Sequence, residues 1–195
     1  MRTKEGDKGG DILRAAVRVF ARDGFDGAKV TAIADEAKVA TGSVYLYFGG
    51  KDDILDALFW EFWVGLRESL ARIETPDPMD RIRRQLVLFY DRLVADRPLA
   101  QVYLRDHHRF VARGSDGTDD FRACLALAEK AFGEACGGET DHERFALSQS
   151  ILFGGVRSAL EYALGRPESE TVSVRDHMIT MAMGSIRVLA QGDGR

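Results

Sequence analysis

Residues 41–51 read TGSVYLYFGGK, and residues 31–40 before them read TAIADEAKVA. The apolar residues of both stretches recur at helical spacing, which predicts two short helices joined by a tight turn at residues 38–40. Thr31 and Thr41 are the predicted N-cap residues of these helices, because a threonine hydroxyl can accept a hydrogen bond from a free amide at a helix start. The stretch therefore predicts a helix-turn-helix.

The second helix of this pair has an inward and an outward side. Val44 and Phe48 are spaced i, i+4 and are expected to face the core. That spacing leaves four residues on or near the outer surface, namely Ser43, Tyr45, Leu46 and Tyr47. No acidic residue occurs from Ala37 to Lys51, although the overall acidic content of the chain would place about two there by chance. Because carboxylates are excluded from a surface that lies on a polyanion, the outer side is predicted to contact DNA.

The charge of the chain is divided unevenly. The whole chain of 195 residues has 27 Lys and Arg and 31 Asp and Glu, a net charge of −4. Residues 1–51 carry nine basic and seven acidic residues, a net of +2, whereas the rest carries 18 and 24, a net of −6. A mildly basic first quarter joined to an acidic remainder is consistent with a nucleic-acid-binding segment attached to a second part of different function.

The rest of the chain is predicted to be helical. A first helix has Asp11 as its N-cap and ends at Gly24, and a long fourth helix is capped by Asp52 and runs to about residue 73. After a break at residues 75–78, further helices are predicted over residues 79–95, 98–113, 118–136, 141–164 and 173–191. No run of alternating polar and apolar residues predicts a strand. The predicted fold class is therefore all-α.

Two domains are predicted. Residues 1–51 form a three-helix helix-turn-helix domain with a disordered tail over residues 1–9, and residues 52–195 form a second helical domain that the long fourth helix joins to the first.

Several classes of protein are disfavoured. Cys124 and Cys136 are the only cysteines, too few for a disulfide framework or a zinc site. His107 and His108 are adjacent on a predicted helix and so point about 100° apart, which does not predict a metal site. The chain has no nucleophile elbow, phosphate loop or pair of carboxylates in an apolar setting, so neither an enzyme nor a cofactor is predicted. A stretch of about 18 apolar residues and a signal peptide are both missing, so the expected location is the cytoplasm, with no membrane partner.

Residues 11–59 resemble the N-terminal domain of the TetR family of transcriptional regulators. The resemblance lies in ILRAA (12–16), FARDGF (20–25), TAIA (31–34), GSVYLYF (42–48) and KDDIL (51–55). It implies that DNA is contacted by the positions that match the family's DNA-binding residues, which are Thr31, Thr41, Gly42, Ser43, Tyr45, Tyr47 and Lys51. One departure is Gly49-Gly50, where many members carry a polar residue or a proline before the lysine.

The same resemblance implies a homodimeric repressor that binds a palindromic double-stranded operator and is released by a small molecule bound in the C-terminal domain. In this family the last two helices of each subunit normally pack as a four-helix interface. The residues that fit such a helix crossing are Leu147, Ile151, Gly154, Gly155 and Ser158, with Met178, Met181, Ala182, Ser185, Ile186 and Leu189 as a second stripe. The alternative is that these residues form an ordinary core within one chain.

The sequence around Lys51 is also similar to that of the FadR-type regulators of fatty-acid degradation, whose ligand is a long-chain acyl-CoA. Such a ligand needs an apolar tunnel for its chain and arginines for its phosphates. The candidates are Phe89, Tyr103 and Phe153 for the tunnel, and Arg105, Arg109 and Arg157 for the phosphates. Two alternatives stay open: a regulator that responds to another hydrophobic ligand, and a DNA binder without a small-molecule ligand.

Overall fold

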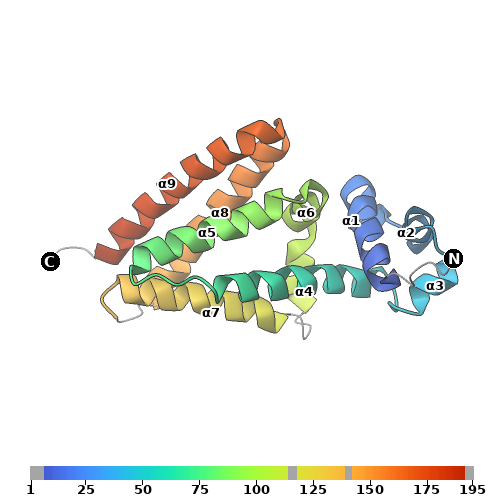
Figure 1. Cartoon of the computed structure of the whole chain (residues 1–195), viewed down its shortest axis with the longest axis horizontal. Helices are drawn as coiled ribbons and strands as arrows, with labels where there is room; N and C mark the ends of the chain where they lie inside the picture. The colour runs from blue at the N-terminus through green and yellow to red at the C-terminus, as the bar shows by residue number, and fades with distance from the viewer. Residues whose placement is uncertain (1–6, 114–117, 139–141, 192–195) are drawn as a thin grey trace. The chain divides into compact units, whose positions relative to one another are not determined.

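The computed structural model describes residues 7–113, 118–138 and 142–191, and every regular element within them is a helix (Figure 1). The predicted all-α class is confirmed. The elements are α1 (Lys8–Gly27), α2 (Val30–Ala37), α3 (Thr41–Tyr45), α4 (Lys51–Leu70), α5 (Pro78–Val94), α6 (Arg97–Arg113), α7 (Thr118–Ala135), α8 (His142–Leu164), the 3-10 helix η1 (Glu168–Glu170) and α9 (Thr171–Gln191). The last five predicted helices begin and end within two residues of α5 to α9. None of the described helices has an apolar stretch long enough to cross a membrane.

The chain forms two compact units. Unit 1 contains residues 1–63 and 97–119, and unit 2 contains residues 64–96 and 120–195. Helix α6 thus belongs with the helix-turn-helix, although it follows α5 in the sequence, and α4 contributes to both units. The domain boundary predicted between residues 51 and 52 stays a prediction, but the compact units are divided elsewhere.

Helix α1 begins one turn earlier than predicted. The side chain of Asp7 accepts a hydrogen bond from the amide of Gly10 at 3.1 Å, so Asp7 is the N-cap and the prediction of Asp11 is wrong. Asp11 lies in the first helical turn and pairs with Arg14 at 2.6 Å. Residues 7–9, predicted as part of the disordered tail, therefore cap and start the helix, while residues 1–6 lie outside the described residues.

Three predicted caps inside the helix-turn-helix region are also wrong, although the helices are present. Helix α2 has Lys29 and α3 has Ala40 at the N-cap position, and neither start has a side-chain cap. The threonines lie one or two residues further inside, and the first helical hydrogen bonds run from Ile33 to the carbonyl of Lys29 and from Ser43 to that of Ala40. Asp52 lies in the first turn of α4, and its neighbour Asp53 accepts from the amide of Gly49 at 2.9 Å.

A buried cluster of rings joins α4 and α6 within unit 1. The imidazole of His107 lies 4.5 Å from the ring centroid of Tyr103 and 5.5 Å from those of Phe59 and Trp63. Phe59 also lies 5.4 Å from Phe110. Burial in this apolar setting disfavours the charged imidazolium and lowers the pKa of His107 from 6.5 to about 4.

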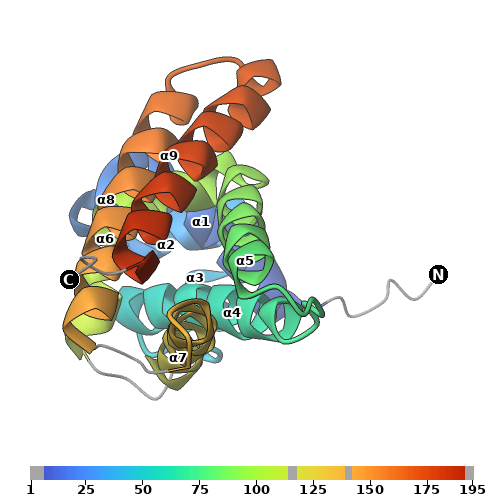
Figure 2. The same cartoon turned by 90° about the vertical axis from the view of Figure 1, so that its left-hand side faces the viewer.

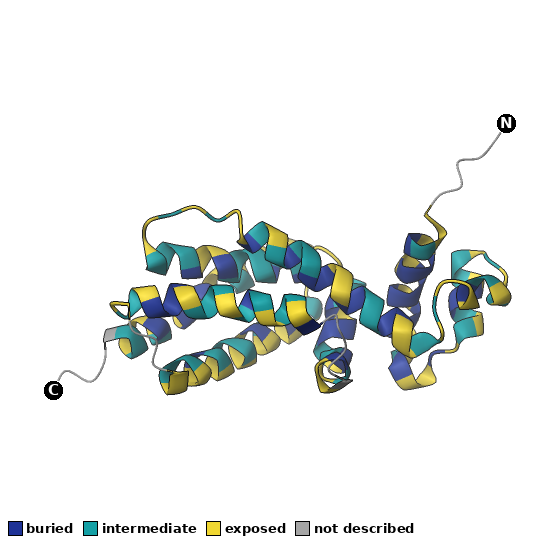
Figure 3. Cartoon of the chain, turned by 90° about the horizontal axis from the view of Figure 1, so that it is seen from below, coloured by how far each residue is buried: buried dark blue, intermediate teal, exposed yellow. Residues whose placement is uncertain are grey.

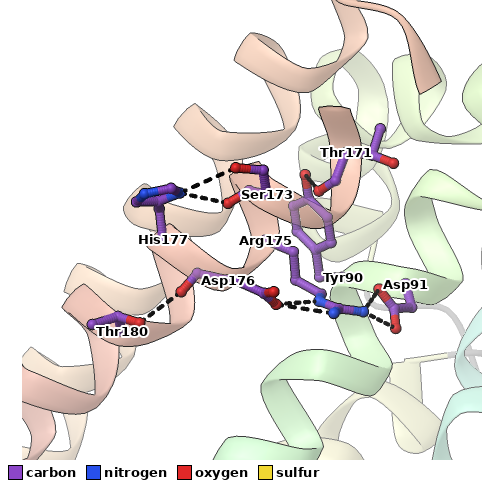
Figure 4. A network of polar contacts seen from close by, with 8 residues as sticks. All are labelled: Tyr90, Asp91, Thr171, Ser173, Arg175, Asp176, His177 and Thr180. Carbon is purple, nitrogen blue, oxygen red and sulfur yellow. Dashed lines mark hydrogen bonds and ion pairs between the residues drawn. The ribbon is translucent and has the colours of Figure 1, made fainter. Parts of the chain in front are cut away.

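Unit 2 contains α5, α7, α8 and α9, and α8 and α9 run side by side in Figures 1 and 2. Helix α5 also contacts both of them. Arg175 of α9 donates to both carboxylate oxygens of Asp91 of α5, at 3.0 and 2.9 Å, and to Asp176 of its own helix (Figure 4). The hydroxyl of Tyr90 donates to the carbonyl of Thr171 at 3.5 Å. These contacts fix the start of α9 on α5.

Figure 3 shows buried and exposed residues alternating along the helices, as their amphipathic sequences require.

His107 gives a prediction about stability. Its folded pKa lies below its unfolded pKa, so the unfolded chain binds more protons between pH 6.5 and about 4, and stability falls as the pH falls through this window. When the pH is lowered from 7 to 4, we expect the unfolding free energy of the wild type to fall by roughly 3 kcal/mol more than that of His107→Phe. Urea titrations at a series of pH values measure this decrease. A His107→Phe chain with the same pH dependence as the wild type would contradict the assignment.

Candidate nucleic-acid interface

Helix α3 presents three large side chains to solvent from a short, firmly anchored turn. Val44 is fully buried, whereas Tyr45, Leu46 and Tyr47 are 55%, 83% and 51% exposed. The amides of Tyr47 and Phe48 both donate to the carbonyl of Val44 at 3.0 Å, so the helix closes immediately after its anchor. The predicted division into an inner and an outer side is confirmed, with Val44 buried and Phe48 half-buried.

The other predicted DNA-contacting residues of this region lie at the starts of α2 and α3. Thr31 and Gly42 are exposed, while Thr41 and Ser43 are half-buried. A methyl group added to Gly42 would meet no atom within 4 Å, so the interior does not require a glycine there. The turn between the helices passes through Lys38, which adopts a left-handed backbone conformation with φ 58°. The geometry leaves these groups available to a partner in front of α3, and their contact with DNA stays a prediction.

Lys51 has a different environment from the other candidates. Its ammonium group donates to the carbonyls of Phe25 at 2.9 Å and of Asp26 at 3.1 Å, and it lies 4.7 Å from the centroid of the Phe25 ring. Lys51 therefore holds the end of α1 through its backbone. Sequence reasoning missed this structural role, because the carbonyls of Phe25 and Asp26 that accept from Lys51 lie 26 and 25 positions away in the chain.

The acidic residues of unit 1 near the helix-turn-helix are largely paired. Glu36 of α2 accepts from Arg18 at 2.7 Å and lies 3.9 Å from Arg22, both on α1. Arg22 also pairs with Asp23, which lowers the pKa of that carboxyl. Pairs this exposed contribute little to stability, but they offset negative charge close to the surface formed by α3.

The candidate effector residues are divided between the two units. Phe89 and Phe153 are half-buried in unit 2, where the exposed Arg157 pairs with Glu161 at 3.0 Å. Tyr103 belongs to the ring cluster of unit 1. Arg105 and Arg109, also in unit 1, contact α1. The role of all six in ligand binding stays a prediction.

Helices α8 and α9 form a groove of about 680 Å³ in unit 2. It is lined by most of the predicted dimer residues, namely Ile151, Gly155, Ser158, Met178, Met181, Ala182 and Ser185. Met181 is 76% exposed, whereas Ile186 is buried within the unit and so packs inside one chain. Tyr162, which the prediction did not include in this surface, also lines the groove and is exposed. Tyr162 lies four residues after Ser158 and three after Ala159 on the same helix, and this spacing could have predicted that all three share one face.

The described residues contain no group of three His, Cys, Asp or Glu side chains placed to hold a metal ion. Cys124 is buried and Cys136 is half-buried, and no disulfide joins them. Burial raises the pKa of Cys124 to about 12, which makes it an inert thiol at neutral pH.

Residues 12–58 match the family model described as bacterial regulatory proteins, tetR family. The chain is 50% identical over 50 residues to the fatty acid metabolism regulator protein of Bacillus subtilis, which is 26% of each chain. It is 32% identical over 98 residues to a nicotine-responsive transcriptional repressor of Paenarthrobacter nicotinovorans, which is 49% of this chain and 50% of the relative. The chain therefore spans half or less of the length of these curated relatives.

One solved structure with a similar fold is the transcriptional regulator FadR of Bacillus subtilis in complex with stearoyl-CoA. It matches 94% of this chain and 98% of its own, with a TM-score of 0.66 and 22% identity, which shows a common fold. Residues 12–58 therefore match the tetR family of bacterial regulatory proteins, and the remaining helices share the fold of this solved regulator.

Proposed function

We propose that this protein is a transcriptional repressor that binds a palindromic operator as a homodimer and leaves it when a small hydrophobic molecule binds. The observation that carries the proposal is the outer side of α3, where Tyr45, Leu46 and Tyr47 project from the buried anchor Val44 in a segment without carboxylates. A surface of this kind suits the major groove, where tyrosine hydroxyls reach phosphates and apolar groups contact thymine methyls. The proposal includes no catalytic step, and it places the protein in the cytoplasm with its DNA.

The DNA-contacting residues of the proposal are Thr31, Thr41, Gly42, Ser43, Tyr45, Tyr47 and Lys51. Within this set, the small groups at the start of α3 allow close approach of the backbone, and the two tyrosines fix the position of the helix on the duplex. Lys51 contributes first by holding the end of α1. The sign of regulation, repression, rests on the similarity to a relative that is named as a repressor.

The homodimer is proposed to form through the groove between α8 and α9. Apolar side chains such as Ile151 and Met181 are exposed there in the single chain, and the glycines and serines of α8 let a second helix approach closely. The remaining members of this surface are Leu147, Gly154, Gly155, Ser158, Met178, Ala182, Ser185 and Leu189. A dimer of this kind would present its two α3 helices about 34–36 Å apart, the length of one DNA turn.

The proposed effector is a long-chain acyl-CoA. Support comes from the similarity of this chain to the fatty acid metabolism regulator of Bacillus subtilis and to the FadR structure from the same species, which was solved with stearoyl-CoA. The ligand would bind one dimer conformation more tightly and so shift the population away from the DNA-binding state. The second candidate is another hydrophobic ligand, which the similarity to a nicotine-responsive repressor favours. A DNA binder without a small-molecule ligand is the third.

The function is tested by selecting sites from a randomised double-stranded DNA library with the purified chain. We expect a palindromic site and a steep loss of affinity with rising salt, because phosphate contacts release counterions. Recovery of no site from the library would contradict the proposal, as would a single half-site bound by a monomer.

Substitutions on α3 should weaken binding to the selected site without unfolding the chain. We expect Leu46→Ala to cost about 1 kcal/mol and Tyr45→Ala about 1–3 kcal/mol of binding free energy, measured by fluorescence anisotropy. Both side chains are exposed, so the thermal midpoint should stay unchanged. Val111→Ala, an exposed apolar residue on α6, is the matched control and should bind as the wild type does.

A charge in the α8–α9 groove should separate the subunits. We expect Met181→Glu to give a monomer in sedimentation velocity at micromolar concentration, because an unpaired carboxylate would be buried in the interface. Affinity for the palindrome should fall with it. Val111→Glu places the same charge outside the groove and should leave the dimer intact, and a dimeric Met181→Glu chain would place the interface elsewhere.

Titration of acyl-CoAs of increasing chain length into the DNA-bound protein tests the effector. We expect long-chain acyl-CoAs to release the protein from DNA and free CoA to leave it bound. The Arg157→Gln variant should need more acyl-CoA for the same release, because it lacks the guanidinium proposed to contact the phosphates. Failure of every chain length would remove acyl-CoA from the proposal and leave the DNA-binding function untouched.

A further inference from the structure

Three cations from two helices surround the end of α1. Arg105 of α6 donates to the carbonyl of Phe20 and, at 3.5 Å, to that of Ala21. Arg109, one turn later, donates to the carboxylate of Asp26 at 2.6 Å, and its guanidinium lies 5.0 Å from the centroid of the Phe25 ring. Since the ammonium of Lys51 lies 4.7 Å from the same ring, Phe25 has a cation from α4 and a cation from α6 as neighbours.

A buried acid lies between the two arginines. Asp106 is only 3% exposed, and its two carboxylate oxygens lie 3.2 Å from Nε of Arg105 and 3.4 Å from Nε of Arg109. Arg105 donates a hydrogen bond to this carboxylate, whereas Nε of Arg109 makes none and is within ion-pair distance only. Asp106 thus places a negative charge beside both guanidiniums.

Helix α1 has a reason to need cations here. Gly24 adopts φ 75°, outside the helical region, so the regular helix stops before it. The last carbonyls of a helix lack amide donors from the next turn and carry the negative end of the helix dipole. Arg105 supplies donors to two of these carbonyls, and Arg109 pairs with the acid just after the break.

We propose that Arg105 and Arg109 are positioning residues for DNA recognition: they hold the end of α1 on α6, and α1 in turn positions α2 and α3. Helix α1 packs on α2 and α2 on α3, so a shift at the end of α1 moves the exposed side chains of α3. This inference rests on the proposed DNA-binding function. It gives both arginines a role other than contact with effector phosphates.

A charge exchange tests the proposal on the full-length protein and its selected DNA site. Arg109→Asp and Asp26→Arg should each weaken DNA binding about tenfold, and the double variant, which has the wild-type net charge, should recover to within about threefold. The slope of affinity against salt should match that of the wild type, because Arg109 does not contact phosphate in this assignment. Arg84→Asp, which changes charge equally in the Arg84–Asp80 pair of α5, should bind DNA as the wild type does.

A double variant no better than Arg109→Asp alone would overturn the proposal. So would an Arg109→Asp chain that binds DNA normally but no longer responds to stearoyl-CoA, since Arg109 would then be an effector ligand. If Arg109→Asp does not fold, as judged by its thermal midpoint, the milder pair Arg109→Gln and Asp26→Asn replaces it, and additive losses in that pair would count against the contact. Failure of the wild type to select any DNA would instead refute the function on which the assignment rests.

Discussion

The helix-turn-helix of this protein depends on the apolar face of α1. Helices α2 and α3 contain eight and five residues, lengths at which an isolated helix is not stable in water. They are stable here because Ile33, Ala34 and Val44 are buried in unit 1, to which α1 contributes fully buried residues such as Ile12 and Phe20. All the exposed groups of α3 therefore take their positions from α1.

The end of α1 is itself held from outside. The backbone break at Gly24 leaves carbonyls near the end of α1 that accept hydrogen bonds from cations of α4 and α6. Lys51 makes this contact from the first residue of α4, and Arg105 and Arg109 make it from α6. The same electrostatic need thus joins three helices that are far apart in the sequence, and it explains why α6 is part of the compact unit that contains the helix-turn-helix.

Among the exposed apolar side chains of the described residues, those at α3 and those at α8 and α9 form surfaces of different character. The surface at α3 is small, aromatic and free of carboxylates, which suits a polyanion with methyl groups in its groove. The groove at α8 and α9 is larger and combines methionine and isoleucine with glycine and serine, which suits another pair of helices. Within unit 2 the Arg175–Asp91 pair fixes α9 against α5, so the groove is presented by a supported helix pair (Figure 4).

The sequence by itself determined the all-α class, the two short helices around the turn at Lys38, and the inward and outward sides of α3, because periodic apolar residues report burial directly. It did not determine the caps. A threonine at a helix start suggests a cap, but α2 and α3 begin one or two residues before Thr31 and Thr41, with Lys29 and Ala40 at the N-cap positions. Only the tertiary structure decided the partners of Lys51, Arg105 and Arg109, which as isolated cations suggested phosphate contacts. Their acceptors are carbonyls and a carboxylate of α1, up to 85 residues away in the sequence, and no local pattern encodes which helix end a distant cation will reach.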